Sequence, residues 1–336
     1  MTLTNGANEM SKVFDCLYGG PNTAKSESAA RLMEQVYRTT RTRSRVVLGD
    51  GSGLTYQHLV DAEIADVCEF GTRPWPQDTM QKLSDGWWPN AENVLVKTDP
   101  EELEKIGVYV FEGLSVGGAY IMGNVKGGLA ERSGKGEKIG QDSPIRIVEG
   151  DINSANGQVV TGSGPGTTFG GNPPSHYNVA QRTLLECLQR SKALPVDYVL
   201  WTAHEADNNP EKDINKESLV GPESVGKAMT GSIQRNFNNT LHFVTAAKKV
   251  KVLDPHTGKM VDSMDLEYRI YTRDHFSATG TTQVRYKACT RGGDDSLPAY
   301  IVAKKPGEGL LDYYTQLAAM RSARTASLMA APGLSV

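Results

Sequence analysis

The sequence predicts an α/β fold, with a mostly parallel sheet flanked by helices and an antiparallel β extension. Short apolar runs alternate with amphipathic or polar segments through the first two thirds of the chain, the pattern of βαβ units. The five runs are residues 13–18, 44–48, 67–70, 108–111 and 197–203. The last two are almost continuously apolar, as in strands covered on both faces. Residues 241–303 instead read as short strands between turn signals, which predicts the antiparallel extension.

The first strand and helix flank a glycine-rich loop. Residues 13–18 are the predicted strand, residues 19–24 the loop, and Lys25 and Ser26 open the helix. The apolar residues of that helix share one face: Ala29, Leu32, Met33, Val36 and Tyr37. The layout matches the phosphate-binding pattern GxxxxGK[ST], except that Ala24 stands in place of the second glycine.

Such a loop binds phosphate because consecutive backbone N–H groups and a helix N-terminus face the ligand. Lys25 is predicted to reach the outer phosphates, and the Ser26 hydroxyl to ligate Mg²⁺. A positive φ at Ala24 would cost alanine on the order of 1 kcal/mol. The alternative is a strand-to-helix turn that binds nothing. The residues predicted to hold the nucleotide are Gly19, Gly20, Pro21, Asn22, Thr23, Ala24, Lys25, Ser26 and Glu27.

The later elements follow in order. A helix at residues 56–65 leads into the third strand, and a second helix lies within the Pro/Trp-rich connection 73–90. Residues 113–175 hold much of the chain's glycine and predict a long loop, interrupted by a strand or turn at 143–151. Helical spacing returns at 177–194, and a short helix near the C-terminus ends in small residues.

Acidic and polar residues follow three of the predicted strands. Glu112 ends the fourth strand, where an acid would hold Mg²⁺ through water, so Ser26 and Glu112 form the predicted metal site. Aspartate is commoner at this place, and a surface acid at a strand end is also common. Asp50 follows the second strand and would activate the attacking water, although Gly-Asp-Gly is also strong turn chemistry.

The fifth strand ends in His204 and Glu205. A polar side chain there would contact the γ-phosphate, and Glu205 is a second candidate base beside Asp50. His204 is equally consistent with a structural histidine beneath the loop.

Two further sets of residues are candidates for contacts outside the nucleotide. Lys227 or Arg235 would reach the nucleotide of a neighbouring subunit, or else be a solvated surface cation. Basic and aromatic residues around the glycine-rich segment would follow single-stranded nucleic acid, or else belong to a polar loop. These residues are Lys126, Arg132, Lys135, Lys138, Phe169, His176 and Tyr177.

Composition excludes several classes of protein. The net charge is −3 and the pI about 6.1, so the whole chain carries no basic nucleic-acid footprint, which leaves a local basic patch as the alternative. The four cysteines are scattered without metal-ligand spacing, which is typical of reduced intracellular thiols. The sequence shows neither a membrane-spanning apolar stretch nor a signal peptide, so we expect a cytoplasmic protein.

Five motifs together resemble a known family. They are YGGPNTAKS, VYVFEGLS, TAHE, GPESVGKAMTGSIQRNF and YKACTRGG. They resemble the RecA-like P-loop ATPases encoded by tailed phages, and are most similar to the short proteins associated with single-strand annealing and recombination. The resemblance covers roughly residues 12–300 in scattered motifs. It implies a RecA-type core, binding of ATP and Mg²⁺, oligomer formation, DNA work and a location in the host cytoplasm. Ala24 and Glu112 depart from the family pattern and put the hydrolysis rate in question.

The predicted organisation follows from these motifs. Residues 1–11 are a flexible N-terminus, residues 12–303 the RecA-like ATPase domain with its glycine-rich insertion, and residues 304–336 a helix and flexible tail. The predicted function is a Mg²⁺-dependent ATPase coupled to DNA recombination, replication or packaging, with single-stranded DNA and further copies of the chain as partners. One alternative is a nucleotide-gated assembly protein with little hydrolysis, and another is a virion structural protein that has lost nucleotide binding. The predicted catalytic residues are Asp50, Glu112, Glu205, His204 and Lys227.

Overall fold

The computed structural model describes most of the chain, in segments. These are residues 12–49, 52–70, 76, 78–133, 174–207, 217–230, 232–253, 255, 258–279, 282–303 and 305–329. The expected flexible N-terminus, 1–11, and the last part of the expected C-terminal helix and tail, 330–336, lie outside the described residues. So do Asp50 and the strand or turn expected at 143–151. The division into domains stays a prediction.

A nine-stranded, mostly parallel sheet forms the centre of the molecule. In spatial order its strands are β15 (Tyr300–Ala303), β11 (Met260–Tyr271), β10 (Asn239–Leu253), β1 (Val13–Gly19), β7 (Tyr198–Ala203), β6 (Ile106–Glu112), β2 (Arg43–Leu48) and β3 (Ala65–Glu69), and β14 (Cys289–Thr290) pairs with β10. From β10 to β3 every neighbouring pair is parallel. The predicted α/β class is therefore confirmed, and all five predicted apolar strands are present.

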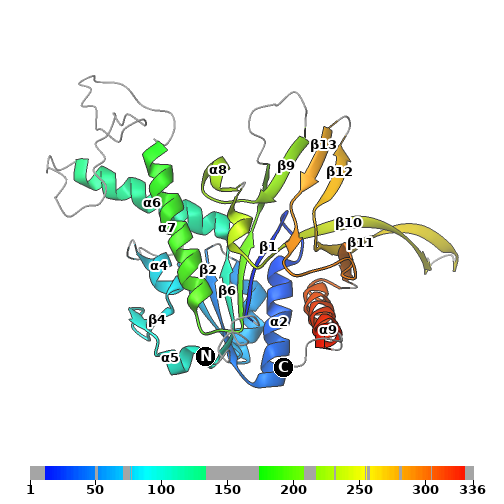
Figure 1. Cartoon of the computed structure of the whole chain (residues 1–336), viewed down its shortest axis with the longest axis horizontal. Helices are drawn as coiled ribbons and strands as arrows, with labels where there is room; N and C mark the ends of the chain where they lie inside the picture. The colour runs from blue at the N-terminus through cyan, green and yellow to red at the C-terminus, as the bar shows by residue number, and fades with distance from the viewer. Residues whose placement is uncertain are drawn as a thin grey trace.

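Helices cover both faces of this sheet (Figure 1). On one face pack α2 (Lys25–Thr40), α9 (Gly309–Met329) and the short turn formed by η1 (Ser52–Tyr56) and α3 (Gln57–Asp61). On the other pack α4 (Thr79–Ser84), α5 (Pro100–Leu103), α6 (Leu114–Ser133) and α7 (Pro174–Ala193). A small hairpin of β4 (Trp87–Pro89) and β5 (Leu95–Lys97) adjoins them. None of the four cysteines, all of which lie within the described residues, forms a disulfide; Cys16, Cys68 and Cys187 are buried and Cys289 is exposed.

The expectation of a long glycine-rich loop from residue 113 was wrong in its first part. Residues 114–133 form α6, although glycine normally disfavours helix. Packing explains two of the glycines. A Cβ on Gly118 would lie 2.7 Å from the Val225 side chain, and one on Gly117 would lie 3.2 Å from that of Met80. The helix is therefore selected by close tertiary contact rather than by local propensity.

The antiparallel extension was also only partly right. The runs expected as separate strands within residues 241–254 are one strand, β10, whose first residues pair parallel with β1 and whose remainder pairs antiparallel with β11. A second sheet of four strands, in the order β12 (His275–Thr279), β13 (Thr282–Tyr286), β9 (Glu217–Pro222) and β8 (Glu205–Asp207), takes part of the expected extension. Period-two alternation identifies a strand but not the sheet that it joins.

A buried acid, Asp15, lies in the middle of β1. Its carboxylate accepts hydrogen bonds from the Asn239 amide nitrogen at 2.8 and 2.9 Å and from the Tyr314 hydroxyl at 2.9 Å. Burial outweighs these bonds and raises the pKa of Asp15 from 3.8 to about 6. The raised pKa means that the folded state binds this proton more tightly than the unfolded state does.

Asp15 therefore makes stability depend on pH. Its contribution is present below the unfolded pKa of 3.8 and is lost as pH rises through about 6. Relative to Asp15→Asn, which does not titrate, the wild type is expected to lose roughly 2 kcal/mol of unfolding free energy between pH 4.5 and 7. Urea unfolding of both proteins at the two pH values measures this. Taking the difference between the proteins cancels titrations that they share, such as that of His275. A difference independent of pH would contradict the assignment.

Candidate functional site

The loop between β1 and α2 has the backbone shape that the pattern predicts. At Gly19 a Cβ would lie 2.2 Å from the backbone oxygen of Phe243 on β10, so only glycine fits. Ala24, the residue before α2, is left-handed with φ 66° and ψ 25°, and Asn22 has φ 59°. The pattern's second glycine therefore falls where a positive φ is required. Alanine adopts this conformation at a cost.

Lys25 is folded back over this loop. Its ammonium donates to the carbonyl oxygens of Gly20 at 2.8 Å and Gly19 at 3.0 Å, and to the Thr23 hydroxyl at 3.3 Å. The Thr23 hydroxyl in turn donates to the Gly20 carbonyl at 2.9 Å. Lys25 is only 9% exposed, so a positive charge is held inside the loop. This is the charge that an anionic phosphate needs.

Replacing alanine by glycine usually lowers the stability of a protein. At Ala24, where the backbone is left-handed, the same change is expected to raise it. Ala24→Gly is expected to raise the unfolding free energy by about 1 kcal/mol, because glycine adopts a left-handed conformation without steric penalty. Ala319→Gly is the matched control. It places the same change in the exposed middle of α9, where it is expected to cost about 1 kcal/mol. Denaturant unfolding measures both, and a loss of stability in Ala24→Gly would contradict the loop geometry.

Glu205 lies against the same loop. A Cβ on Gly20 would be 3.6 Å from Oε1 of Glu205, so the carboxylate borders the loop backbone. The other oxygen, Oε2, is 3.1 Å from Nε2 of His242 on β10. This hydrogen bond lowers the pKa of Glu205, partial burial opposes it, and the Lys25 charge adds to the lowering. Glu205 is therefore an ionised carboxylate beside the lysine of the loop.

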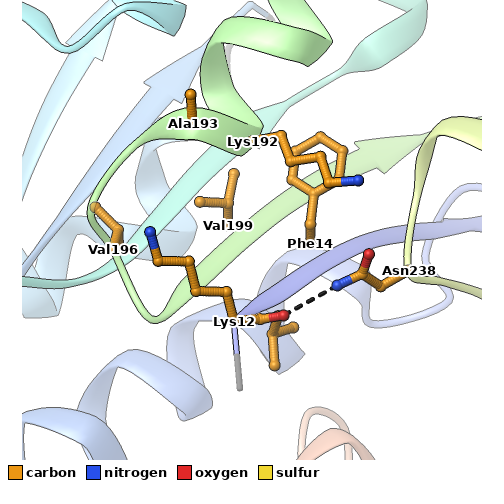
Figure 2. A pocket seen from close by; sticks show the side chains of 8 residues that line it. Lys12, Phe14, Lys192, Ala193, Val196, Val199 and Asn238 are labelled. Atoms are coloured by element: carbon orange, nitrogen blue, oxygen red, sulfur yellow. Dashed lines mark hydrogen bonds between the residues drawn. The ribbon is translucent and has the colours of Figure 1, made fainter. Parts of the chain in front are cut away.

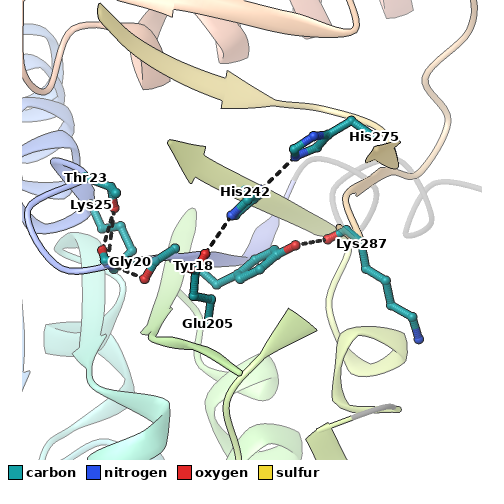
Figure 3. A network of polar contacts seen from close by, with 9 residues as sticks. Tyr18, Gly20, Thr23, Lys25, Glu205, His242, His275 and Lys287 are labelled. Carbon is teal, nitrogen blue, oxygen red and sulfur yellow. Dashed lines mark hydrogen bonds and ion pairs between the residues drawn. The ribbon is translucent and has the colours of Figure 1, made fainter. Parts of the chain in front are cut away.

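A chain of hydrogen bonds continues from Glu205 through two histidines (Figure 3). Nδ1 of His242 lies 2.8 Å from Nε2 of His275 at the start of β12. A carboxylate only accepts, so Nε2 of His242 donates to Glu205 and Nδ1 of His242 accepts from His275. Burial lowers the pKa of His242 and lowers that of His275 to about 4, so both rings are neutral at pH 7.

Stacked rings hold His242 in place. Its ring stacks on Tyr18 at 4.6 Å and on Tyr286 at 4.8 Å between centroids. The Tyr18 hydroxyl donates to the Lys287 carbonyl at 2.6 Å, and His275 stacks on Tyr271 at 3.5 Å. His242 is 1% exposed, so its ring is fixed by packing as well as by hydrogen bonds.

Glu112 ends β6, at the same edge of the sheet as the loop. In the sheet, β7 lies between β6 and β1. Glu112 is buried, and its carboxylate accepts hydrogen bonds from the hydroxyls of Tyr56 and of Thr202, the latter at 2.5 Å. The Thr202 hydroxyl also accepts from the Gly113 amide at 2.8 Å. Both carboxylate oxygens are thus oriented by hydroxyl groups of neighbouring elements.

The other predicted site residues are spread around this edge. Ser26 is half-buried in the first turn of α2, and Glu27 pairs with Arg31 at 3.6 Å on the same helix. The backbone amide of His204 donates to the Ser115 hydroxyl at 3.3 Å, and its carbonyl accepts from Glu223 at 2.7 Å. Of the phosphate-loop residues, Pro21 and Asn22 are exposed.

Several candidates cannot be placed against the site. Asp50 lies outside the described residues, and Lys227 belongs to α8 (Gly226–Thr230) with its side chain outside them. Arg235 is exposed in η2 (Ile233–Asn236). Of the proposed nucleic-acid contacts, Lys135, Lys138 and Phe169 lie outside the described residues, as do the side chains of Lys126, Arg132 and His176. Tyr177 is half-buried in α7.

Sequence reasoning missed three residues of this arrangement, Tyr56, His242 and His275. Thr202 lies in the motif TAHE at the polar end of the fifth strand, and His242 lies in a predicted strand, but nothing in the sequence pairs either with an acid. Within the residues that the structure describes, no cluster of three His, Cys, Asp or Glu side chains suited to a metal is present. None of the described helices is long and apolar enough to cross a membrane.

A cavity of about 560 Å³ lies at the opposite end of β1 from the loop (Figure 2). Two lysines line it, Lys12 and Lys192, together with Phe14 and Asn238. The Asn238 amide donates to the Lys12 carbonyl at 3.0 Å, and the Lys12 ammonium donates to the Leu194 carbonyl at 3.3 Å. This end carries neither the left-handed loop nor the strand-end acids. Lys192 therefore serves as a control for the loop lysine.

Comparisons with known proteins give likenesses to solved structures. No protein-family model and no curated protein matches the chain. Among solved structures, the chain is similar to a KaiC-like protein from the hyperthermophilic archaeon Pyrococcus horikoshii OT3, with a TM-score of 0.35 and 9% identity over 82% of this chain and 89% of that one. A likeness at this level says nothing about function. Function is therefore argued from the geometry of the site.

Proposed function

We propose that this protein binds ATP with Mg²⁺ at the loop of residues 19–26 and hydrolyses it. The observation that supports this most is the position of Lys25, whose charge is held 2.8 Å from the Gly20 carbonyl inside a left-handed loop. The loop lies at the carboxyl end of a parallel strand, which is where α/β sheets bind ligands. The neighbouring acid, Glu205, belongs to the same edge.

The loop residues suit a chain of phosphates. The N-terminus of α2 directs backbone N–H groups and a partial positive charge toward the loop. The Lys25 ammonium has three protons, now directed at two carbonyls and a hydroxyl. On binding, it exchanges at least one of these neutral acceptors for a phosphate oxygen, which gives a stronger, charge-assisted hydrogen bond.

Glu205 is proposed to orient the attacking water and accept its proton. It is ionised at neutral pH, and its Oε1 faces the loop while Oε2 is held by His242. The hydrogen bond to one carboxylate oxygen stops the group from rotating. The other oxygen therefore keeps one orientation, which it needs in order to position a water. Asp50 remains the rival for this role.

Ser26 and Glu112 would hold Mg²⁺, Ser26 directly and Glu112 through water. The hard oxygen donors of a hydroxyl and a carboxylate suit this ion. When bound, Mg²⁺ neutralises charge that develops on the phosphate oxygens. The Glu112 carboxylate accepts hydrogen bonds from the hydroxyls of Tyr56 and Thr202, which fix its orientation at the end of β6.

ATP turnover by the full chain, with and without Mg²⁺, tests the proposal. Hydrolysis is expected with Mg²⁺ in excess over ATP and is expected to stop on adding excess EDTA. Calorimetric titration with ATP runs in parallel. Tight ATP binding without turnover would replace this proposal with the nucleotide-gated assembly protein. Absence of both binding and turnover would refute the site itself.

Coupling to single-stranded DNA is proposed from the family resemblance alone. The test is the ATPase rate with and without a single-stranded oligonucleotide, repeated at rising salt. Stimulation that weakens with salt supports DNA coupling, because phosphate contacts release counterions. An unchanged rate would remove DNA from the proposal and leave the ATPase in place.

A further inference from the structure

The far parts of β10 and β11 form a hairpin arm that extends from the body of the molecule (Figure 1). We define the arm as residues 247–253 and 260–266. The pairing of β10 with β1 ends at Phe243, and that of β11 with β15 begins at Tyr268. Among the described residues, the two arm strands therefore pair only with each other.

One face of the arm carries four exposed apolar side chains beside Lys249, Lys251 and Asp262. The register places Leu253 opposite Met260, and Met264 and Leu266 follow on the same face because side chains alternate. These four side chains are 63%, 59%, 59% and 57% exposed, in the order just given. We call them the apolar face.

Such an arm is unusual in a chain that acts alone. A two-stranded ribbon is marginal in water without a packed face. Several large exposed apolar side chains gathered on one face mark an interaction surface rather than ordinary solvent-facing structure. The apolar face therefore needs a partner that covers it.

The charges of the arm are separated by strand. On β10 the arm carries Lys248, Lys249 and Lys251, and its described residues include no acid. On β11 it carries Asp262 and Asp265, with no base among its described residues. A nucleic acid would meet an acidic strand beside the basic one. A second arm offers the matching pattern when its β11 lies over this β10.

We propose that the apolar face is an interface with a second copy of this chain, with the two arms packed face to face about a two-fold axis. β10 of each copy lies over β11 of the other, which sets Lys249 and Lys251 against Asp262. Two packed β layers stand about 10 Å apart, close enough for the apolar side chains of both faces to interdigitate. A two-fold interface uses the same patch on both copies. The proposal is independent of ATP binding.

The mass of the full chain in solution tests it, by sedimentation or light scattering over a range of concentrations. The wild type is expected to be at least dimeric, and Met264→Asp is expected to raise the dissociation constant by at least tenfold. Val261→Asp is the matched control on the opposite face of the same strand. It is expected to leave the mass unchanged. Circular dichroism checks that both variants are folded.

A charge exchange distinguishes this specific interface from nonspecific association of apolar surfaces. Lys249→Glu with Lys251→Glu is expected to weaken the dimer, and adding Asp262→Lys is expected to restore it. A monomeric wild type, or equal losses in Met264→Asp and Val261→Asp, would overturn the proposal. It would also be overturned if Met264→Asp lost binding to a single-stranded oligonucleotide while its mass stayed the same, because the arm would then bind nucleic acid.

Discussion

Lys25→Ala is expected to lower the ATP turnover number by about 10²- to 10³-fold, the usual cost of removing one fixed donor to a transition-state charge. ATP affinity is expected to fall as well, because a charge-assisted hydrogen bond contributes about 1.5–3 kcal/mol. The physical reason is the position of the ammonium, which donates to two loop carbonyls at 2.8 and 3.0 Å and so holds a positive charge inside the loop. Steady-state kinetics and calorimetry measure the two effects separately.

The matched control for this change is Lys192→Ala. Lys192 is an exposed lysine at the cavity on the other end of β1, so its removal takes away the same charge far from the loop. Turnover is expected to stay within about twofold of wild type, since surface charges contribute little. Lys25→Arg checks the fold, because it keeps the charge and changes the geometry. Equal losses in Lys25→Ala and Lys192→Ala would show that the loop is not the ATP site.

Glu205→Gln is expected to lower the turnover number by about 10²- to 10⁴-fold, the range of general-base contributions. ATP affinity is expected to change little, because the amide keeps the size of the carboxylate and still accepts a hydrogen bond from His242. A loss in turnover with preserved affinity is the signature of a group that acts in the transition state. Single-turnover hydrolysis beside equilibrium binding gives both quantities.

His242→Phe and Asp50→Asn make this prediction specific. His242→Phe removes the hydrogen bond that lowers the pKa of Glu205 and leaves the burial that raises it, so the acid limb of the pH–rate profile is expected to move to higher pH. Asp50→Asn removes the carboxylate of the other candidate base, so its turnover number can be compared with that of Glu205→Gln. Normal turnover in Glu205→Gln beside a large loss in Asp50→Asn would give the role to Asp50.

The loop and its strand were predictable because their signals are local. The glycines, Lys25 and Ser26 are neighbours in sequence, and the helix after them shows its buried face by spacing alone. The pattern also indicated that alanine at position 24 would be strained if the loop required a positive φ there, and the structure confirms that φ is positive. Strand-end acids at one edge followed from the rule that carboxyl ends of parallel strands meet.

The misassigned segments had competing local signals. Glycine in α6 disfavours helix, and only contacts with Val225 and Met80 explain why Gly118 and Gly117 suit it. The alternation in residues 241–303 is the same for a strand of the central sheet and for one of the second sheet, so it could not divide them. Both errors come from reading a local pattern where tertiary contacts decide.

The sequence by itself determined the phosphate-type loop, its lysine, the five apolar strands and the mostly parallel sheet. Only the tertiary structure decided which acid borders the loop and what holds it. Glu205 and His242 are 37 residues apart, and His275 is a further 33 residues along the chain. Their meeting depends on β10 lying beside β1 and on β8 and β12 belonging to the second sheet. The order of strands in space, which local periodicity does not encode, brings these side chains together.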